Sequence, residues 1–443
     1  MHDIVVAGGG LAGLAIGGLL SKLGFAVRVA EARENSAQQA SDALRSINLA
    51  LSARGIRTLD ALGLTHEVMR NAVPMLGRRI HLGDGTEDFQ VYDLVGNRAV
   101  YSVRRSQLWQ FLCSAAESNG VEIIYDARCV NVDCDARKIK IVNQSGRMSQ
   151  LEYDALIGGD GAHSVVRRKL VQSGTAVEET HILRHGYIEL LVPSECGACL
   201  DRHALHIWPR EDRMLVALPN ADGSFTATLF VPLEDDNDLQ TRQALFPMFC
   251  EKFPDAVPLI HDLRNSLMEN PLGRLFTGKC RPWGDGASLL LIGDAAHAMA
   301  PFYGQGMNCA LEDCWMLMRS VERFADDWPQ IFSEFERCRH PDADAITLLS
   351  EANYREMSQR VLQADFKLRR EIERALQIRF PTTFVPLYAM VTFSTLPYAE
   401  ALARSCAQAR IVDRLATGLG GIGDLDLEAA WLRAALENAG AVH

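Results

Sequence analysis

DIVVAGGGLAG, the segment from Asp3 to Gly13, decides the fold of the N-terminal part of the chain. Residues 3–7 predict a short buried strand, and the apolar run from Leu11 to about Leu23 predicts a helix directly after the glycines. A second strand is predicted at Ala26–Ala30. This order of elements predicts a βαβ unit, the building block of parallel sheets.

The glycines of this segment fit the pattern G-x-G-x-x-G between a strand and a helix. Glycine allows a tight turn and the close approach of a pyrophosphate to N–H groups at the positive end of the helix. Glu31 ends the second strand, where a carboxylate can accept hydrogen bonds from a ribose. The motif predicts a dinucleotide site, with FAD and NAD both open, formed by Gly8, Gly10, Leu11, Ala12, Gly13 and Glu31.

The rest of the chain predicts an α/β protein with three regions. Further strands are predicted at Val121–Tyr125, Lys138–Val142, Ala155–Gly158 and Ser288–Ile292, so the α/β core is assembled from distant segments. We expect a Rossmann-like dinucleotide-binding domain of residues 1–75, 101–180 and 270–344. Alternating apolar runs predict a mostly antiparallel substrate-binding sheet of residues 76–100 and 181–269, and residues 345–443 form a C-terminal helical region.

The composition excludes several classes of partner. A net charge of −11 opposes attraction to a phosphate backbone, so no nucleic acid is expected. Because no apolar run reaches the roughly 18 residues of a spanning helix and the N-terminus lacks a basic leader, we expect a soluble cytoplasmic protein without a membrane anchor. The 11 cysteines are irregularly spaced, which predicts reduced thiols and no metal site. Nothing in the sequence predicts an oligomeric state.

Two further motifs follow the glycine loop. The first is the stretch Asp154–Arg167, in which a strand leads into Asp160 and Gly161, and the second is Gly293-Asp294-Ala295-Ala296-His297, followed by Pro301–Asn308. With them the chain resembles the flavoprotein aromatic hydroxylases, although Gly159 stands where that family more often has alanine. The resemblance implies that the dinucleotide is FAD, bound by Arg105, Asp160, Gly293, Asp294, Gly304, Gly306, Met307 and Asn308. It also implies a structural hydrogen-bonding role for His297 rather than acid/base work.

Within that family the chain resembles the kynurenine 3-monooxygenases. The matching stretches are Arg45–Ser52, His206–Pro209, Ala217–Asn220, Ser224–Thr226 and Phe302–Asn308, and the likeness extends to about Leu402. It implies hydroxylation of L-kynurenine to 3-hydroxykynurenine in tryptophan catabolism, with NADPH and O2, through a flavin C4a-hydroperoxide. NADPH is expected as a transient co-substrate because the chain has no second glycine motif, and its preference over NADH rests on the resemblance alone.

The resemblance also assigns a substrate pocket. Arg78 and Tyr92 would hold the substrate carboxylate, with adjacent Arg79 as a rival for the same role. Asn353, Met357 and Tyr388 would complete the wall, and the aromatic ring would be enclosed by Leu205, Leu218, Thr228, Phe230, Pro301 and Phe302. Core packing is the alternative interpretation of the apolar members. Because an amino-substituted ring is already nucleophilic, we assign no catalytic acid or base.

Two other functions compete with this one. A natural-product hydroxylase acting on a modified kynurenine or an anthranilate-like ring would share the fold and the cofactor. A non-catalytic protein could keep the glycine motif for structural reasons, although the complete set of motifs weighs against it.

Overall fold

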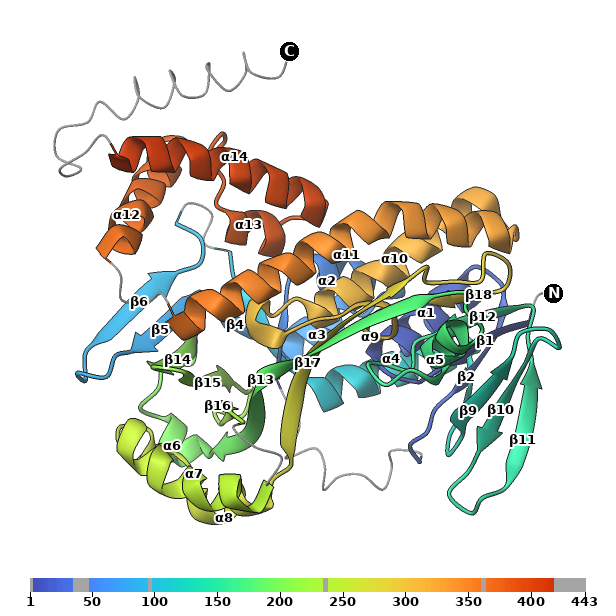
Figure 1. The fold of residues 1–443 in the computed structure, drawn as a ribbon, viewed down its shortest axis with the longest axis horizontal. Helices are drawn as coiled ribbons and strands as arrows, with labels where there is room; N and C mark the ends of the chain where they lie inside the picture. The colour runs from blue at the N-terminus through green and yellow to red at the C-terminus, as the bar shows by residue number, and fades with distance from the viewer. Residues whose placement is uncertain (1–2, 35–47, 95–97, 234–237, 360–363, 418–443) are drawn as a thin grey trace.

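The computed structural model describes residues 3–34, 48–94, 98–233, 238–359 and 364–417. Its N-terminal part contains a parallel sheet in the order β18-β12-β1-β2-β8, visible at the right of Figure 1. The strands are β1 (Asp3–Ala7), β2 (Ala26–Ala30), β8 (Glu122–Ile124), β12 (Ala155–Gly158) and β18 (Leu289–Leu291). Helix α1 (Leu11–Lys22) connects β1 to β2, which pair in parallel. The predicted βαβ unit is therefore confirmed, and so is the assembly of this sheet from distant segments.

One predicted core strand lies elsewhere. Lys138–Val142 forms β10 of a separate antiparallel sheet, between β9 (Arg128–Asp133) and β11 (Met148–Glu152). The burial pattern of β10 explains why it belongs to a separate sheet. Ile139 and Ile141 are buried while Lys140 between them is exposed, whereas all four residues of β12 are buried. A strand with one solvated face suits an antiparallel sheet, and strands of a parallel sheet are buried on both faces. Our placement of β10 in the parallel core was wrong.

A seven-stranded sheet forms the second part of the fold, in the order β17-β13-β16-β15-β14-β5-β6. All of its neighbours pair antiparallel except β14 and β5. The long strands β13 and β17 run from this sheet toward the parallel sheet (Figure 1). The strands are β5 (Gly77–His81), β6 (Glu87–Val91), β13 (Val177–Val192), β14 (Ala204–Arg210), β15 (Arg213–Pro219), β16 (Phe225–Pro232) and β17 (Leu272–Arg281).

Our division into domains stays a proposal, and several observed elements do not follow its boundaries. Strands β7 (Val100–Arg104) and β13 run through the boundaries at residues 100 and 180. Strand β17 lies after the boundary at residue 269, yet it pairs with β13 in the large sheet. Helix α11 (Trp328–Gln359) runs through the boundary at residue 344. The crossings of β13 and α11 arise because a single long element connects two regions, which hydrophobic patterns within each region do not indicate.

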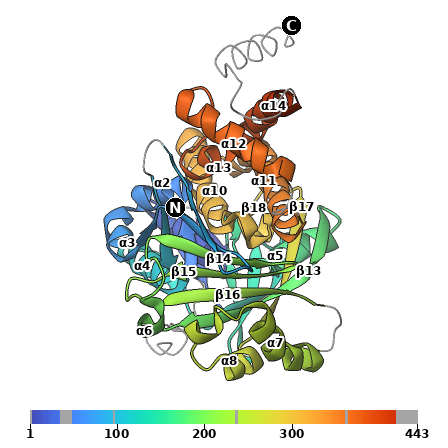
Figure 2. The same cartoon turned by 90° about the vertical axis from the view of Figure 1, so that its left-hand side faces the viewer.

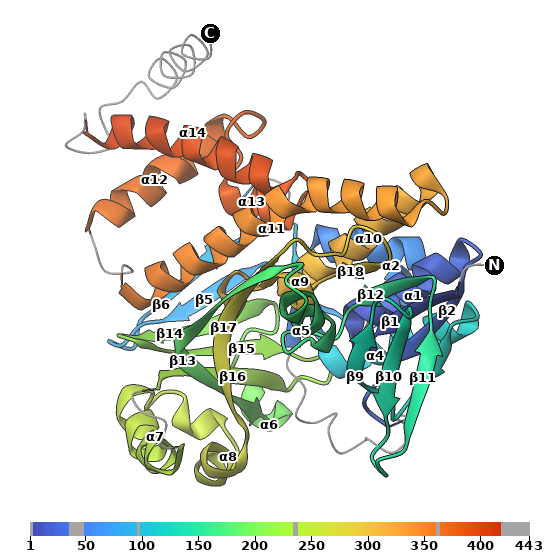
Figure 3. The same ribbon diagram turned by 45° about the vertical axis from the view of Figure 1, so that its right-hand side comes forward.

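The two faces of the large sheet pack against different elements. Helices α7 (Asp238–Lys252) and α8 (Leu263–Glu269) pack on one face, where Phe249 and Phe253 join Trp208 and Phe225 in a buried core. Figure 3 shows these helices below the sheet and α11 above it. Because side chains alternate along a strand, the residues between the core positions point to the other face. That face is directed toward α11 and the cofactor domain.

The C-terminal part is helical, as predicted. Helix α11 packs against α10 and α14, and α14 also contacts α12 and α13 (Figure 2). The helices of this part are α10 (Gly306–Phe324), α11, α12 (Ala364–Arg379), α13 (Leu387–Thr392) and α14 (Tyr398–Thr417). No helix among the described residues is long and apolar enough to cross a bilayer.

The remaining elements frame the cofactor domain. A small antiparallel sheet consists of β3 (Asn48–Leu51), β7 (Val100–Arg104) and β4 (Val73–Met75). The other helices are α2 (Ala53–Leu62), α3 (Thr65–Asn71), α4 (Arg105–Ser118), α5 (Val165–Gln172), α6 (Ser194–Gly197) and α9 (Asp294–His297). Short 3-10 turns occur at Val257–Leu259 and Pro301–Tyr303.

Candidate functional site

The glycine loop between β1 and α1 has the shape that a dinucleotide needs. Gly8 has a φ of +96°, and a Cβ there would lie 2.6 Å from the carbonyl oxygen of Gly159. A Cβ on Gly13 would lie 1.9 Å from the carbonyl oxygen of Gly8, so these two glycines are required by the fold itself. Gly10 is different, because nothing lies within 4 Å of a Cβ built on it. The open space beside Gly10, at the start of α1 with Leu11 and Ala12, fits a pyrophosphate.

Glu31 lies against this loop. Its carboxylate accepts hydrogen bonds from the backbone N–H of Arg33 at 2.8 Å and from Arg33 Nε at 2.7 Å. Arg33 also donates to the carbonyl of Gly9, and its guanidinium lies 4.7 Å from the ring centre of Trp109. The Trp109 indole N–H donates to the same Gly9 carbonyl at 2.7 Å. Sequence reasoning missed both Arg33 and Trp109, which fix the loop on its outer side.

Asp160 has a different local role from the one we expected. Its carboxylate accepts from the hydroxyl of Ser164 and from the backbone N–H of Val165 at 2.6 Å, so it caps helix α5. Its backbone lies beside Gly8, because a Cβ on Gly8 would come within 2.7 Å of Asp160 Cα. Asp160 therefore shapes the floor of the glycine loop through its backbone.

Arg167, from the same motif, connects two cofactor loops. It donates to the carbonyl of Ala295 at 2.9 Å, and to the carbonyl of Ala162. Its Nε bonds the carboxylate of Glu178 at 2.9 Å. The arginine thus holds the loop before α5 against α9, a role that we did not assign from the sequence.

Asp294 is the first residue of α9 and faces an internal space. Its side chain is reached by solvent, yet protein surrounds it closely enough that burial raises its pKa, against the opposing effects of His297 and Arg105. Arg105, at the start of α4, is exposed and has no hydrogen bond or ion pair among the described residues. A carboxylate deep in the protein and an unengaged guanidinium near it leave room for a polar ligand such as the ribityl chain of FAD.

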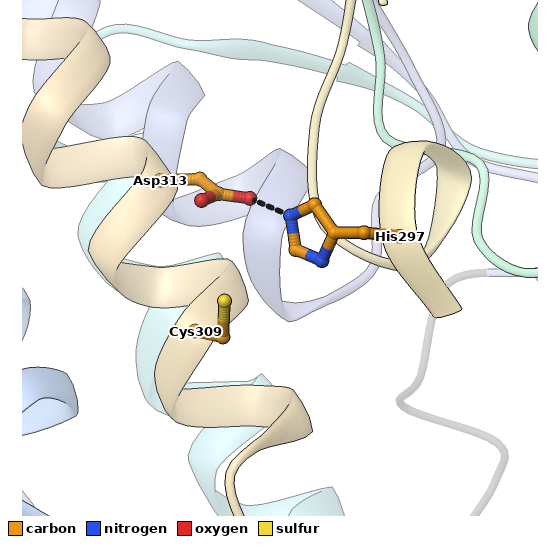
Figure 4. A group of neighbouring side chains, drawn as sticks. All are labelled: His297, Cys309 and Asp313. Atoms are coloured by element: carbon orange, nitrogen blue, oxygen red, sulfur yellow. Dashed lines mark hydrogen bonds and ion pairs between the residues drawn. The ribbon is translucent and has the colours of Figure 1, made fainter. Parts of the chain in front are cut away.

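His297 has the structural role that we predicted. Its Nε2 lies 2.6 Å from Asp313 Oδ2, which also accepts the backbone N–H of Gly293 at 2.9 Å (Figure 4). Burial alone would raise the pKa of Asp313, but His297 and Arg339 outweigh this effect and lower it. The pair fixes the peptide of Gly293 directly before Asp294.

The same histidine and aspartate approach Cys309 closely enough to suggest a metal site (Figure 4). The guanidinium of Arg339 already occupies this position. Arg339 donates to Asp313 Oδ1 at 2.9 Å and contacts Cys309 Sγ at 3.4 Å. Since a metal ion would have to displace the guanidinium from its carboxylate, the chemistry of the group favours an ion-pair network over a metal centre.

This network extends from the cofactor loop to the C-terminal helices. Arg339 bonds Glu312 at 3.0 Å, and Glu312 bonds Arg54 at 2.9 Å. All three side chains are almost fully buried. Arg54 then donates to the carbonyl of Val391 in α13 at 3.0 Å and lies over the ring of Tyr398. Buried charges connect Gly293 to the helix that carries Tyr388.

The segment from Gly304 to Asn308 forms the start of α10. Gly304 adopts a left-handed conformation with a φ of +67°, and Gly306 and Met307 open the helix. The side chain of Asn308 is fully used within the protein, since it accepts from Ser52 N–H at 2.9 Å and donates to the carbonyls of Ala50 and Gly304. Any contact of Asn308 with a cofactor must therefore use its backbone.

Five of the predicted substrate residues lie on the face of the large sheet that is opposite α7 and α8. Strand register pairs Arg78 with Leu205 and with Gln90 across β14, β5 and β6. On the neighbouring strands Leu218 pairs with Thr226, Thr228 with Val216, and Phe230 with Met214. These positions are two residues apart along each strand, so they share one face. The predicted residues on this face are Arg78, Leu205, Leu218, Thr228 and Phe230.

Arg78 meets two tyrosines at the edge of this face. Its Nε donates to Gln90 Oε1 at 2.8 Å. The rings of Tyr92 and Tyr388 stack with centres 5.0 Å apart. Burial raises the pKa of Tyr388 to about 12 and that of Tyr92 well above its usual range, and Arg78 opposes both shifts. Both phenols remain protonated donors at neutral pH, next to a guanidinium.

Arg79 points to the opposite side of the sheet. It forms ion pairs with Glu87 at 3.2 Å and with Asp201 at 3.3 Å, and its guanidinium lies over the ring of Phe89. Its charge is therefore neutralised away from the two tyrosines. This geometry favours Arg78 over Arg79 as the carboxylate-binding residue.

The 3-10 turn at Pro301–Tyr303 closes the apolar side of the face. The rings of Phe302 and Phe230 have centres 5.0 Å apart, and Phe302 also contacts Tyr354. Asn353 Nδ2 donates to the carbonyl of Phe302 at 2.6 Å, which fixes the turn to α11. Pro301 itself is exposed. Met357 belongs to α11, but its side chain lies outside the described residues, as do Arg45–Ile47 of one resembling stretch.

Sequence reasoning missed further residues of this face. Ile207, Met214, Val216 and Tyr187 cluster with Leu205, Phe230 and Phe302. The signal was available in part, because Met214 and Val216 precede Leu218 at intervals of two residues along β15. Tyr187 could not be found this way, since its place depends on the pairing of β13 with β16.

Comparisons with known proteins show the family to which the chain belongs. Residues 1–347 match the family model described as an FAD binding domain. The chain is 40% identical over 420 residues to a kynurenine 3-monooxygenase of Flavobacterium psychrophilum, covering 94% of this chain and 93% of that one. It is 39% identical to the kynurenine 3-monooxygenase of Stenotrophomonas maltophilia (96% and 94% covered) and 36% identical to that of Dictyostelium discoideum (94% and 93% covered).

Solved structures share the fold at lower identity. The tetrameric form of 2-methyl-3-hydroxypyridine-5-carboxylic acid oxygenase matches with a TM-score of 0.65 at 23% identity, over 82% of this chain and 94% of that one. A tetracycline destructase matches with a TM-score of 0.65 at 15% identity, over 90% of this chain and 99% of that one. The predicted arrangement of a Rossmann-like domain, a second sheet and a helical C-terminal part is confirmed.

Proposed function

Because the chain belongs to the kynurenine 3-monooxygenase family of FAD-binding proteins, we propose that it hydroxylates L-kynurenine to 3-hydroxykynurenine with NADPH and O2. The observation that carries the proposal is the arrangement of side chains on the face of the large sheet opposite α7 and α8. A carboxylate-binding group of Arg78, Tyr92 and Tyr388 lies at one edge, and an aromatic wall lies toward the cofactor loops. This polarity matches a substrate with an amino-acid end and an aromatic end.

The distance across the face suits a small aromatic amino acid. Arg78 on β5 is in register with Thr226 on β16, three strand intervals away, and Phe230 lies four residues further along β16. At a strand spacing of about 4.8 Å and a rise of about 3.3 Å per residue, the backbones of Arg78 and Phe230 are about 20 Å apart. The side chains reach inward from both ends and shorten this span. A ligand held by its carboxylate at Arg78 would therefore place its ring beside Phe230 and Phe302.

The protein residues bind, orient and shield. Arg78 would donate hydrogen bonds from its terminal N–H groups to the substrate carboxylate, while the phenol of Tyr92 or Tyr388 adds a directional donor. Phe230, Phe302 and Leu205 would exclude water from the reacting ring. When bound, FAD supplies hydride acceptance from NADPH and the transfer of one oxygen atom from O2. Gly10, Asp294 and Arg105 are the residues that we propose to hold it.

We extend the proposal to the cellular setting. All 11 cysteines are free thiols, including the Cys196 and Cys199 pair. Free thiols in this number support a reducing compartment, because oxidising ones favour disulfides. A cytoplasmic location and a role in tryptophan catabolism are therefore part of the proposal.

The decisive experiment measures NADPH consumption with and without L-kynurenine, coupled to mass analysis of the product. We expect faster consumption with kynurenine and a product heavier by one oxygen atom. Stopped-flow reduction of the bound FAD should also be accelerated by kynurenine. Reduction rates unaffected by kynurenine, with unchanged peroxide yield, would instead favour a modified kynurenine or a related anilino ring as the substrate.

A further inference from the structure

Glu189 is an unexplained carboxyl on the substrate-facing side of the large sheet. It lies in β13, directly opposite Thr228 of β16, and its strand neighbour Tyr187 lies opposite Phe230. The proposed ring-binding residues Thr228 and Phe230 are therefore its cross-strand neighbours. Glu189 is half-buried, and its side chain has no hydrogen bond or ion pair among the described residues. A carboxyl in this position is unexpected, because burying a charged group beside aromatic side chains costs free energy.

The charged groups facing Glu189 connect it to the cofactor site. Among the described residues, Arg105 of α4 is the one charged group that acts on it, and Tyr187 is its titratable neighbour on β13. Arg105 also acts on Asp294 of α9. One guanidinium therefore faces two carboxyls, one on the cofactor side and one on the substrate side, and forms a direct ion pair with neither.

The overall reaction consumes a proton. The substrate C–H, NADPH, O2 and one proton become the C–OH product, NADP⁺ and water. Hydride transfer brings a negative charge into the site before this proton is used, and an added negative charge near a carboxyl favours its protonated form.

We propose that Glu189 holds the proton that the reaction consumes, taking it from solvent onto its carboxyl when hydride transfer adds negative charge beside Arg105. The inference rests on the proposed function, since it concerns the same cofactor and pocket. In this arrangement Arg105 stays charged, and Glu189 changes its protonation to balance the site. The proton is later released into the water that the reaction forms.

The titration of Glu189 agrees with this role. Burial raises its pKa to about 7, and the attraction of Arg105 only partly opposes the shift. The carboxyl is therefore poised near neutral pH before any charge is added. Arrival of a negative charge would raise its pKa further, so that it takes up a proton at and above pH 7.

The test measures the midpoint potential of the bound FAD against pH in the holoenzyme, without kynurenine or NADPH. We expect the slope in the wild type to steepen, by one proton per two electrons, in a window that begins near pH 7. Glu189→Gln should lose this steepening, because its amide cannot take up a proton. Glu179→Gln is the matched control, since Glu179 is an exposed residue of the same strand. It should keep the wild-type slope.

Steepening that persists in Glu189→Gln would overturn the proposal. If that variant fails to fold or to bind FAD, Glu189→Asp decides, because it keeps a carboxyl at the same position. It should retain the steepening in a shifted pH window, and its loss would also overturn the proposal. Because no substrate enters the measurement, failure of the kynurenine assignment would leave these results unchanged and would appear only in the turnover assay.

Discussion

Replacement of Arg78 by alanine tests the substrate assignment most directly. In the structure Arg78 Nε donates to Gln90 at 2.8 Å, and the two terminal nitrogens have no hydrogen-bond partner among the described residues, so they can bind a carboxylate. Hydrogen bonds to a charged partner contribute about 1.5–3 kcal/mol. At about 1.4 kcal/mol per tenfold change, Arg78→Ala should raise the Kd for kynurenine roughly tenfold to a hundredfold. FAD content should stay near the wild-type level, because Arg78 lies on β5, outside the cofactor loops.

The assay is titration of each purified holoenzyme with kynurenine, followed by the change in flavin absorbance. Arg79→Ala is the matched control, since Arg79 carries the same charge one residue away but binds Glu87 and Asp201 on the other face. Arg78→Lys should recover only part of the affinity, because lysine lacks the planar two-donor fork. If only Arg79→Ala loses affinity, the wrong arginine has been chosen. If neither variant does, the carboxylate-binding group does not exist.

Three further outcomes are expected. Asp294→Ala should purify with little flavin, measured as the absorbance ratio of FAD to protein, and full occupancy would contradict its role as a ligand to the cofactor. Arg339→Met should lower the free energy of unfolding by about 3–5 kcal/mol in denaturant titration, because it leaves the carboxylate of Asp313 buried without its arginine partner; a wild-type midpoint would argue against the network. Burial lowers the pKa of His206 to about 4 from an unfolded value of 6.5, so the folded state binds its proton less readily. Above pH 6.5 this shift does not change the free energy of unfolding. As the pH falls toward 4, the free energy of unfolding decreases by up to about 3 kcal/mol, because the unfolded state binds the proton more readily. Unfolding midpoints of His206→Asn should accordingly depend less steeply on pH over this window than those of the wild type.

The sequence predicts the local elements well and their assembly less well. The strands β1 and β2 and helix α1 were predicted within a residue because an apolar run and a glycine turn define them locally. Lys138–Val142 was recognised as a strand but was assigned to the wrong sheet, since strand pairing depends on distant segments.

The residues of the candidate site could likewise be predicted only where the local sequence identifies them. The glycine loop could be found from its own residues, but Arg78 and Arg79 are adjacent, and only the register of β5 against β14 and β6 decides which of them faces the pocket. Tyr92 and Tyr388 are separated by most of the chain, and their stacking has no local signal. Glu189 went unnoticed because its neighbours come from α4 and β16, far from it in sequence.

The alternation of side chains along β14, β15 and β16 has a practical consequence for changing substrate preference. Residues such as Leu205, Val216 and Thr228 lie on the face that we propose binds the substrate, while Trp208, Leu215 and Leu229 belong to the core on the opposite face. A mutant library restricted to every second position of these strands would vary the shape of the pocket and leave the packing against α7 and α8 intact. The protein therefore offers a scaffold in which new aromatic substrates can be selected with little loss of foldable variants.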